Sequence, residues 1–214
     1  MVRPASEFLI DKYYRADFGM IGANVIGAYD GTIVLIHNEG NIRFSALIPK
    51  NLIVLAGIEK VVPTLEEALK VVYITSRFAK YKVAGYYDVY GDVYKRQGYY
   101  DVYGSSEDFK NRQVYIIFLD NGRKQMIEDP AFTEAAYCLR CGACMYSCPV
   151  FKIIAGKFGG PTYMGGIGTI WTYFIDGELK AIPAIYSCLL DGRCVERCPL
   201  NIDVPRMIKL LRFR

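Results

Sequence analysis

The 214-residue sequence contains no long hydrophobic run, and this excludes one class of protein at once. Its longest apolar stretches, such as 51–57 and 114–119, fall far short of the roughly 20 residues that a membrane-spanning helix needs. Residues 1–14 contain Glu7 and Asp11 and no continuous apolar segment, so they do not resemble a signal peptide. We therefore expect no membrane span and a cytoplasmic location.

Clustered positive charge and histidine are also scarce. Lys and Arg total 26 against 22 Asp and Glu, a formal charge of +4, but outside 206–214 the basic residues are scattered. Because phosphate binding needs a clustered basic face, nucleic acid is not an expected partner. The segment 19–31 lacks G-x-G-x-x-G, so it carries no flavin or nicotinamide fingerprint. The single histidine, His37, follows an apolar run and is interpreted as structural.

The first half of the chain has the pattern of an α/β domain. Apolar runs rich in β-branched residues predict strands at 21–28, 32–37, 51–57 and 114–119. The sequence Asp30-Gly31 predicts a hairpin turn between the first two strands, and 38–41 predicts another tight turn. The run at 51–57 is consistent with a strand buried on both faces.

Two capping patterns predict helices. Thr64 and Glu67 have the spacing of a capping box, which favours a helix over 65–78. Asp129 and Pro130 have the order of an N-cap and a first helical residue, which predicts a short helix over 131–137 that leads into the first cysteine.

A seven-residue segment, Gly-Tyr-Tyr-Asp-Val-Tyr-Gly, occurs twice, at 85–91 and at 98–104. The six residues between the copies, 92–97, are those that one reading frame of the transposon end used in sequencing-library preparation encodes. Our hypothesis is that 85–97 is an assembly artefact, and the alternative is a genuine tyrosine-rich tandem repeat. Resequencing the native locus by PCR decides between them, because recovery of 92–97 from native DNA would exclude the artefact.

Seven cysteines in a chain without an export signal do not indicate a disulfide framework, so their spacing carries the information. The first four follow C-x2-C-x2-C-x3-C and are followed by Pro149, and this is the pattern of two-cluster ferredoxins. Three thiolates spaced in this way can hold three corners of one iron-sulfur cluster, while the fourth faces the other cluster. The four are Cys138, Cys141, Cys144 and Cys148.

The remaining cysteines repeat this pattern fifty positions later, with one substitution. Three positions of the first run are matched by Cys188, Cys194 and Cys198. The position equivalent to Cys141 is occupied by Asp191. Because the fourth cysteine of each run ligates the other cluster in such ferredoxins, two crossed ligand sets are predicted. Cluster 1 takes Cys138, Cys141, Cys144 and Cys198, and cluster 2 takes Cys188, Asp191, Cys194 and Cys148. A carboxylate holds iron less firmly than a thiolate, so cluster 2 is expected to be either [4Fe-4S] with a labile corner or [3Fe-4S].

Two other interpretations of the cysteines are less favoured. Zinc sites commonly use two separated pairs of N or S ligands, and His37 lies about a hundred residues before the first cysteine. A catalytic cysteine is not expected, because all seven thiols already belong to the two runs. The sequence identifies no catalytic residue.

Together, several segments resemble the lactate-utilization iron-sulfur proteins of the LutB/LldF type. These segments are 22–24, 31–35, 38–41, 57–66, 120–123, 138–150 and 159–168. The resemblance implies a partial α/β LUD domain over 1–127, NagB/RpiA/CoA-transferase-like in fold, followed by a small α-helical ferredoxin-type module with two clusters over 128–214. It also implies that the chain is a fragment, since family members have further LUD sequence before this region and a further segment after it.

The function that the resemblance implies is electron transfer in a cytosolic complex that oxidises L-lactate, or another 2-hydroxy acid, to the keto acid. The expected partners are the other subunits of that complex and a redox protein. An alternative is that the LUD part is itself a catalytic or ligand-binding module of CoA-transferase type, with Glu39 as its carboxylate nucleophile and the ferredoxin as an accessory. A third is a structural scaffold whose clusters are never reduced in turnover.

Overall fold

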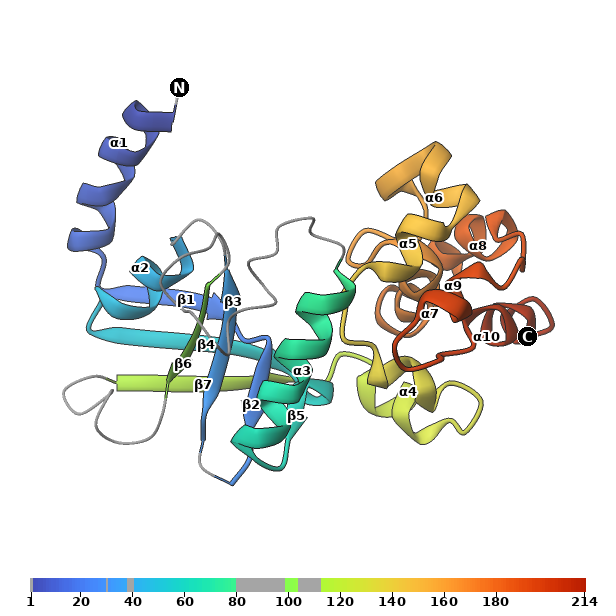
Figure 1. Ribbon diagram of the computed structural model, residues 1–214, viewed down its shortest axis with the longest axis horizontal. Helices are drawn as coiled ribbons and strands as arrows, with labels where there is room; N and C mark the ends of the chain where they lie inside the picture. The colour runs from blue at the N-terminus through green and yellow to red at the C-terminus, as the bar shows by residue number, and fades with distance from the viewer. Residues whose placement is uncertain (1, 30, 38–40, 80–98, 104–112) are drawn as a thin grey trace. The chain divides into compact units, whose positions relative to one another are not determined.

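The computed structural model describes residues 2–29, 31–37, 41–79, 99–103 and 113–214. The chain divides into two compact units, residues 1–73 with 81–119, and residues 74–80 with 120–214. The first unit carries the sheets, and the second is helical (Figure 1). No helix in the described ranges combines the length and hydropathy that a bilayer crossing requires.

A parallel sheet forms one layer of the first unit. Its described strands are β1 (Phe18–Gly22), β4 (Asn51–Gly57) and β7 (Gln113–Leu119), with β4 between the other two. Figure 1 shows these strands side by side. Side chains alternate between the two faces of β4, so Leu52, Val54 and Ala56 are buried while Ile53 and Leu55 are half-buried. The strand over 51–57 is confirmed, and its burial is complete on one face only.

The single strand predicted over 21–28 is wrong. The chain instead forms β1 and a second strand, β2 (Val25–Gly27), which belong to different sheets. The change occurs at two consecutive residues: the Ala23 N–H donates to Leu55 O of β4, and the Asn24 N–H donates to Val34 O. The Asn24 side chain stabilises this passage of the chain from one sheet to the other, because its Oδ1 accepts from the Ile36 N–H at 2.8 Å.

The second sheet has the order β5, β2, β3, β6 within the described residues. The predicted hairpin is confirmed: β2 pairs in antiparallel fashion with β3 (Ile33–His37), and Gly31 has a φ of 68° in the turn between them. Strand β5 is Val61–Val62, and β6 is Tyr99–Tyr103. The second copy of the tyrosine-rich segment therefore contains a strand, whereas 85–97 and the predicted turn residues 38–40 lie outside the described residues.

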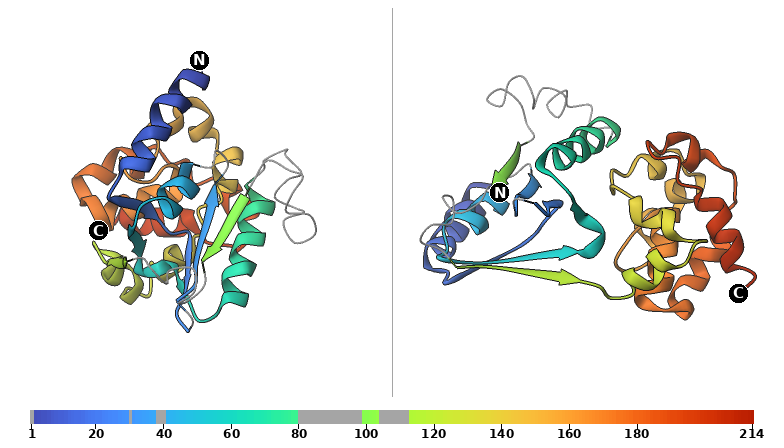
Figure 2. Two further views of the ribbon diagram at one scale, coloured as in Figure 1. Left: turned by 90° about the vertical axis from the view of Figure 1, so that its left-hand side faces the viewer. Right: turned by 90° about the horizontal axis from the view of Figure 1, so that it is seen from below.

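Helix α3 (Leu65–Phe78) has the predicted bounds. Its capping box is formed: the Thr64 N–H donates to Glu67 Oε2 at 3.1 Å, and the Glu67 N–H donates to Thr64 Oγ1 at 3.5 Å. Ala68 and Val72 of this helix pack on β2 and β3, and Figure 2 shows the helix beside these strands. The other described helices of this unit are α1 (Val2–Arg15), α2 (Asn41–Leu47) and the 3-10 turn η1 (Ile58–Lys60).

The second unit is built from short helices around one apolar core. The largest buried side chains of this core are Trp171, Phe132, Ile170, Met207 and Ile208. Its elements in chain order are α4 (Arg123–Glu128), η3 (Thr133–Tyr137), α5 (Ala143–Ser147), α6 (Pro149–Ile154), η4 (Ala155–Lys157), α7 (Gly165–Asp176), α8 (Glu178–Ser187), α9 (Arg193–Arg197) and α10 (Val204–Leu211).

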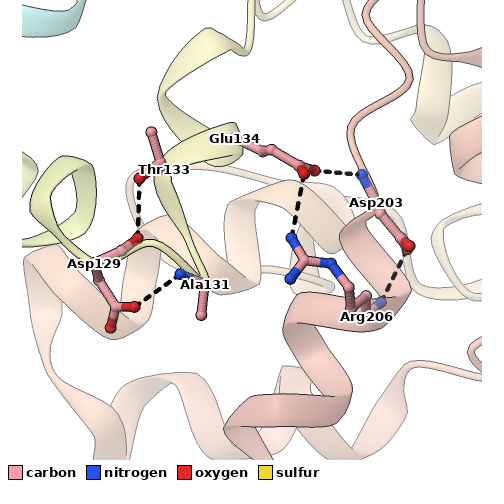
Figure 3. A network of polar contacts seen from close by, with 6 residues as sticks. All are labelled: Asp129, Ala131, Thr133, Glu134, Asp203 and Arg206. Atoms are coloured by element: carbon pink, nitrogen blue, oxygen red, sulfur yellow. Dashed lines mark hydrogen bonds and ion pairs between the residues drawn. The ribbon is translucent and has the colours of Figure 1, made fainter.

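The predicted helix over 131–137 is also wrong in its start and its type. The segment forms the 3-10 helix η3, which begins at Thr133, and Asp129 is instead the C-cap of α4. The Asp129 carboxylate accepts from the Ala131 N–H at 3.0 Å, and the Thr133 hydroxyl donates to the Asp129 carbonyl (Figure 3). These local bonds form a turn between two short helices, which is the alternative that an Asp side chain offers to an N-cap.

Candidate iron-sulfur centre

The two cysteine loops have the same backbone, fifty residues apart. Gly142 and Gly192 precede α5 and α9 with φ of 76° and 78°, in the left-handed region that glycine adopts without strain. Cys148 and Cys198 end these helices with φ of −71° and −77°. The repeat recognised in the sequence is therefore also a repeat of local conformation.

The first predicted ligand set converges on one cavity of about 200 Å³. Cys138, Cys141 and Cys144 line it from the first loop, and Cys198 lines it from the end of the second. Cys194, a predicted ligand of cluster 2, lines the same cavity. The thiols are within electrostatic range of one another. Most of the remaining wall is apolar, including Ile167, Ile202 and Val204, so the sulfur atoms are its main donor groups.

The second predicted set is also brought together. Cys194 is within electrostatic range of Cys148, Cys188 and Asp191, so members of both loops meet here as well. The Asp191 side chain is 31% exposed and forms an ion pair with Arg193, with 3.5 Å between Oδ2 and Nε. Asp191 thus lies beside the two cysteines of its own loop, at the position that Cys141 has in the first.

Burial raises the pKa values of five thiols, Cys138, Cys141, Cys144, Cys188 and Cys194, and so favours their protonated form in the absence of a metal. It raises the pKa of Cys138 to about 11, and it raises the pKa values of Cys144 and Cys194 to about 12. Backbone N–H groups act in the opposite direction: the Arg140 N–H donates to Cys138 Sγ at 3.4 Å and lowers the pKa of that thiol. A group bound at these sulfurs must displace their protons and supply the positive charge that stabilises four thiolates.

A polar clamp joins the segments that enter and leave the first cavity (Figure 3). Glu134, four residues before Cys138, accepts from the Asp203 N–H at 3.2 Å and from Arg206 Nη2 at 3.3 Å. Asp203, five residues after Cys198, caps α10 by accepting from the Arg206 N–H at 3.0 Å. The clamp therefore holds the cysteine of the second loop against the cysteines of the first.

Two arginines and two aromatic rings form the wall beside the first loop. The Arg140 guanidinium lies 4.0 Å from the Tyr163 ring centroid and 4.6 Å from that of Trp171. Arg123 is 5% exposed, donates to the Tyr163 hydroxyl at 3.1 Å and lies 5.5 Å from the Trp171 ring. The cation-π contacts keep positive charge close to the cavity without burying it unpartnered.

The donor set fits a sulfur-ligated cluster. All seven cysteines are free, half-buried thiols, and thiolates are the ligands that iron-sulfur clusters take. The buried Trp171 Nε1–H has no hydrogen-bond acceptor among the described residues, and Trp171 lines the same cavity. Nowhere in the described part of the chain do three His, Cys, Asp or Glu side chains lie close enough to hold a single metal ion. The sulfur atoms surround a cavity instead, as a cluster of several irons requires.

Comparisons with known proteins agree with this geometry. The LUD domain model matches residues 2–118, and the 4Fe-4S dicluster domain model matches residues 134–202. The chain belongs to the LUD-domain family. Lactate utilization protein B 1 of Bacillus mycoides (strain KBAB4) is 33% identical to this LUD-domain chain over 217 residues, covering 100% of the chain and 42% of the relative. Lactate utilization protein B of Bacillus thuringiensis (strain Al Hakam) is 33% identical over 199 residues, covering 92% and 39%.

The LUD-domain chain therefore spans about two fifths of the length of these relatives. A crystal structure of a DUF162 family protein from Deinococcus radiodurans matches 50% of this chain and 56% of its own, with 20% identity and a TM-score of 0.33. That likeness is too remote to refine the fold. The family assignment rests on the domain models and on the lactate utilization relatives.

Sequence reasoning located the thiols of this LUD-domain protein but missed their surroundings. Glu134 and Trp171 lie outside every motif, and the segments that contain Arg123 and Tyr163 gave no reason to place these residues beside the cysteines. Arg140 did have a signal, since it is a charged residue that the fifty-residue repeat aligns with Leu190. His37 is the last residue of β3 and is distant in the sequence from the cysteines. Glu39 lies outside the described residues.

Proposed function

We propose that this LUD-domain chain is the electron-transfer component of a complex that oxidises L-lactate, or a related 2-hydroxy acid, to its keto acid. The observation that carries this proposal is that thiols of the two loops come together in two places, with Cys198 near Cys138 and Cys148 near Cys194. The lactate utilization relatives supply the substrate class, and the other subunits of such a complex are the proposed partners. The proposal includes a NagB/RpiA/CoA-transferase-like fold for the LUD part.

The chemistry comes from the bound clusters, each of which exchanges one electron at a time. Cys138, Cys141, Cys144 and Cys198 are the proposed ligands of cluster 1, and Cys148, Cys188, Asp191 and Cys194 are those of cluster 2. Oxidation of a 2-hydroxy acid to a keto acid releases two electrons, so two one-electron sites close together match the substrate.

The protein's part is to hold the two sites close and to shield them. Cys144 of the first set lies within electrostatic range of Cys194 of the second, so the sites share a boundary. Ser147, between them in α5, donates to the Arg193 carbonyl at 3.1 Å and joins α5 to α9. Apolar side chains around the first cavity exclude water, and backbone N–H groups such as that of Arg140 donate to sulfur. Both effects set cluster potentials.

Crossed ligation is tested by the pairing of variants. Cys141→Ala and Cys198→Ala, which lie 57 residues apart, are expected to remove the same EPR signal from the reduced protein. Cys148→Ala, which belongs to the first run, is expected to remove the other. Loss of the same signal in both first-run variants, Cys141→Ala and Cys148→Ala, with Cys198→Ala removing the other signal, would show uncrossed ligation and overturn the assignment.

Electron transfer is tested with the partner subunits. Adding L-lactate to the anaerobic complex is expected to bleach the cluster absorbance in stopped-flow measurements, with slower or smaller bleaching in the Cys198→Ala variant. Clusters that stay oxidised while the complex forms pyruvate would favour the scaffold interpretation and contradict the proposal.

A further inference from the structure

The first loop carries a charged side chain where the second loop has an apolar one. The fifty-residue shift aligns Arg140 with Leu190, and both residues have left-handed backbones, with φ of 60° and 57°. Each also directs its N–H to the sulfur of the first cysteine in its loop, Cys138 or Cys188. The backbone is the same at the two positions, so the side chain is the difference between them.

The Arg140 side chain is held at the wall of the first cavity. Its guanidinium stacks on Tyr163 and Trp171, whose ring centroids are 5.4 Å apart. All three residues line the cavity that Cys138 and Cys141 line. A guanidinium is weakly hydrated and stacks well on aromatic rings, so this position suits Arg better than Lys.

We propose that Arg140, stacked on Tyr163 and Trp171, raises the reduction potential of cluster 1, an inference that rests on the electron-transfer function proposed above. Reduction adds one electron to the cluster and breaks no bond, so the site becomes more negative by one charge. A fixed positive charge in a partly buried site stabilises this additional negative charge. Arg stays protonated in proteins, so the effect is present at every accessible pH.

A separate observation is that a buried donor of the same wall lacks an acceptor in the described part of the chain. Trp171 is 1% exposed, and its Nε1–H has no acceptor among the described residues. Buried indole N–H groups usually have a partner. The sulfide and thiolate sulfurs of a bound cluster supply acceptors in the cavity that Trp171 lines. The wall that carries the Arg140 charge is therefore a wall that faces the cluster.

The second site has an arginine of its own, but it is bound differently. Arg212 Nη2 donates to the carbonyls of Ile185 at 2.9 Å and of Cys188 at 2.6 Å. These carbonyls lie at the C-terminal end of α8, where the helix dipole offsets a positive charge. The negative Asp191 also lies beside this site. The Arg140 effect is thus expected to be larger at cluster 1 than at cluster 2.

The test is a potentiometric titration of the whole anaerobic chain, with EPR detection of each reduced cluster. Arg140→Leu gives the first loop the residue that the second loop has at this position. We expect it to lower the cluster 1 potential by roughly 59 mV, which is about a tenfold change in the one-electron equilibrium constant. The cluster 2 potential is expected to fall less, because Arg140 lies at the first loop. Leu190→Arg, the reciprocal variant, is expected to raise the cluster 2 potential. Arg193→Leu, which removes an exposed arginine from the second loop, leaves cluster 1 unchanged.

An unchanged cluster 1 potential in an Arg140→Leu protein that keeps its iron would overturn the inference and leave the electron-transfer function intact. A wild-type chain that binds no cluster would overturn the function instead. If the Arg140→Leu protein loses cluster 1, the titration is repeated with the Arg140→Gln variant, because Gln keeps length and polarity without charge. The same fall in the cluster 1 potential in Arg140→Gln then supports the inference. Loss of cluster 1 in both variants would instead assign Arg140 a structural role and overturn the inference.

Discussion

At the scale of single residues, the two loops differ at the points where their chemistry is set. Asp191 replaces the cysteine that the repeat predicts, and Leu190 replaces the arginine beside it. The loops also differ at four further positions, 143/193, 145/195, 146/196 and 147/197, but they share the remaining cysteines, the proline that follows each run and the left-handed glycines Gly142 and Gly192. The differences at Asp191 and Leu190 are therefore expected to give the two sites different properties on one repeated backbone.

Asp191 is expected to make the second cluster labile. In Asp191→Cys, mild oxidation leaves eight irons per chain, because a thiolate holds the corner iron more firmly than a carboxylate does. The wild-type chain keeps about seven and shows a three-iron EPR signal. Cys141→Asp is the matched control, since it moves the carboxylate to the first loop and is expected to make cluster 1 labile as well. Equal iron retention in the wild-type and Asp191→Cys chains would contradict this role.

Asp129 gives the helical unit a defined acid sensitivity. Burial acts to raise the pKa of this carboxyl, but the Arg214 guanidinium, 2.6 Å away, and the Ala131 N–H together hold the pKa below its usual 3.8. A lowered pKa in the folded state contributes stability above about pH 3.8, and this contribution is lost as the pH falls through the folded value.

The free energy of unfolding of the iron-free chain, measured in urea, is therefore expected to fall more steeply below pH 4 in the wild type than in Asp129→Asn. The Asn side chain keeps a hydrogen-bonding oxygen but cannot titrate. Parallel pH profiles for the two chains would show that Asp129 is not linked to stability.

At the scale of elements, signals from neighbouring residues predicted the capping box of α3 and the hairpin of β2 and β3 but not the start and type of η3, and contacts between distant residues were not predicted. The capping box of α3 is formed by residues three apart, so the sequence was sufficient to predict it. The break between β1 and β2 depends on Leu55 and Val34, which are 32 and 10 residues away from Ala23 and Asn24. The cysteine loops were predictable because cluster chemistry dictates their spacing, whereas the Arg140 wall depends on Tyr163 and Trp171 of a later segment.

The Glu134 clamp is expected to hold cluster 1 in place. Glu134→Ala removes the acceptor for the Asp203 N–H and for Arg206, and we expect a loss of about 1 kcal/mol in the free energy of unfolding. Iron should be released from cluster 1 before cluster 2 during chelator challenge. Glu134→Gln is the control, because it keeps an oxygen for the Asp203 N–H and is expected to lose less. Simultaneous loss of both clusters in Glu134→Ala would argue against a specific clamp.

Helix α7 approaches the segment before it so closely that one position accepts only glycine. A Cβ on Gly168 would overlap the backbone carbonyl oxygen of Tyr163. Tyr163 is the residue whose ring contacts the Arg140 guanidinium. Ala is the better helix former by about 1 kcal/mol, yet we expect Gly168→Ala to destabilise the chain by about 1–3 kcal/mol in thermal unfolding. Gly22→Ala, where the new methyl group meets nothing within 4 Å, is the control. A Gly168→Ala chain as stable as the wild type would show that the close approach is not required.

At the scale of the whole molecule, all eight proposed ligands and the core that supports them belong to one compact unit. The buried core of that unit extends from Met126 to Leu211, and the ligands lie between Cys138 and Cys198. The LUD sheets contribute none of these residues. Metal binding is thus expected to be a property of the helical unit.

A chain of residues 120–214 is accordingly expected to take up as much iron as the 214-residue chain, with the same EPR signals after reduction. The matched control is the same fragment with Cys198→Ala, which should lose cluster 1 alone. A fragment that folds, as judged by circular dichroism, but binds no iron would show that the LUD part is needed to form the sites.

The most direct test of the account is the iron content of the whole chain purified without oxygen, measured together with its EPR spectra before and after reduction. We expect seven or eight irons per chain and two distinguishable clusters: eight with no signal before reduction when Asp191 holds the fourth iron, and seven with a three-iron signal when it does not. A chain that contains zinc and little iron, or a single cluster, would contradict the assignment of this LUD-domain protein as a two-cluster electron carrier.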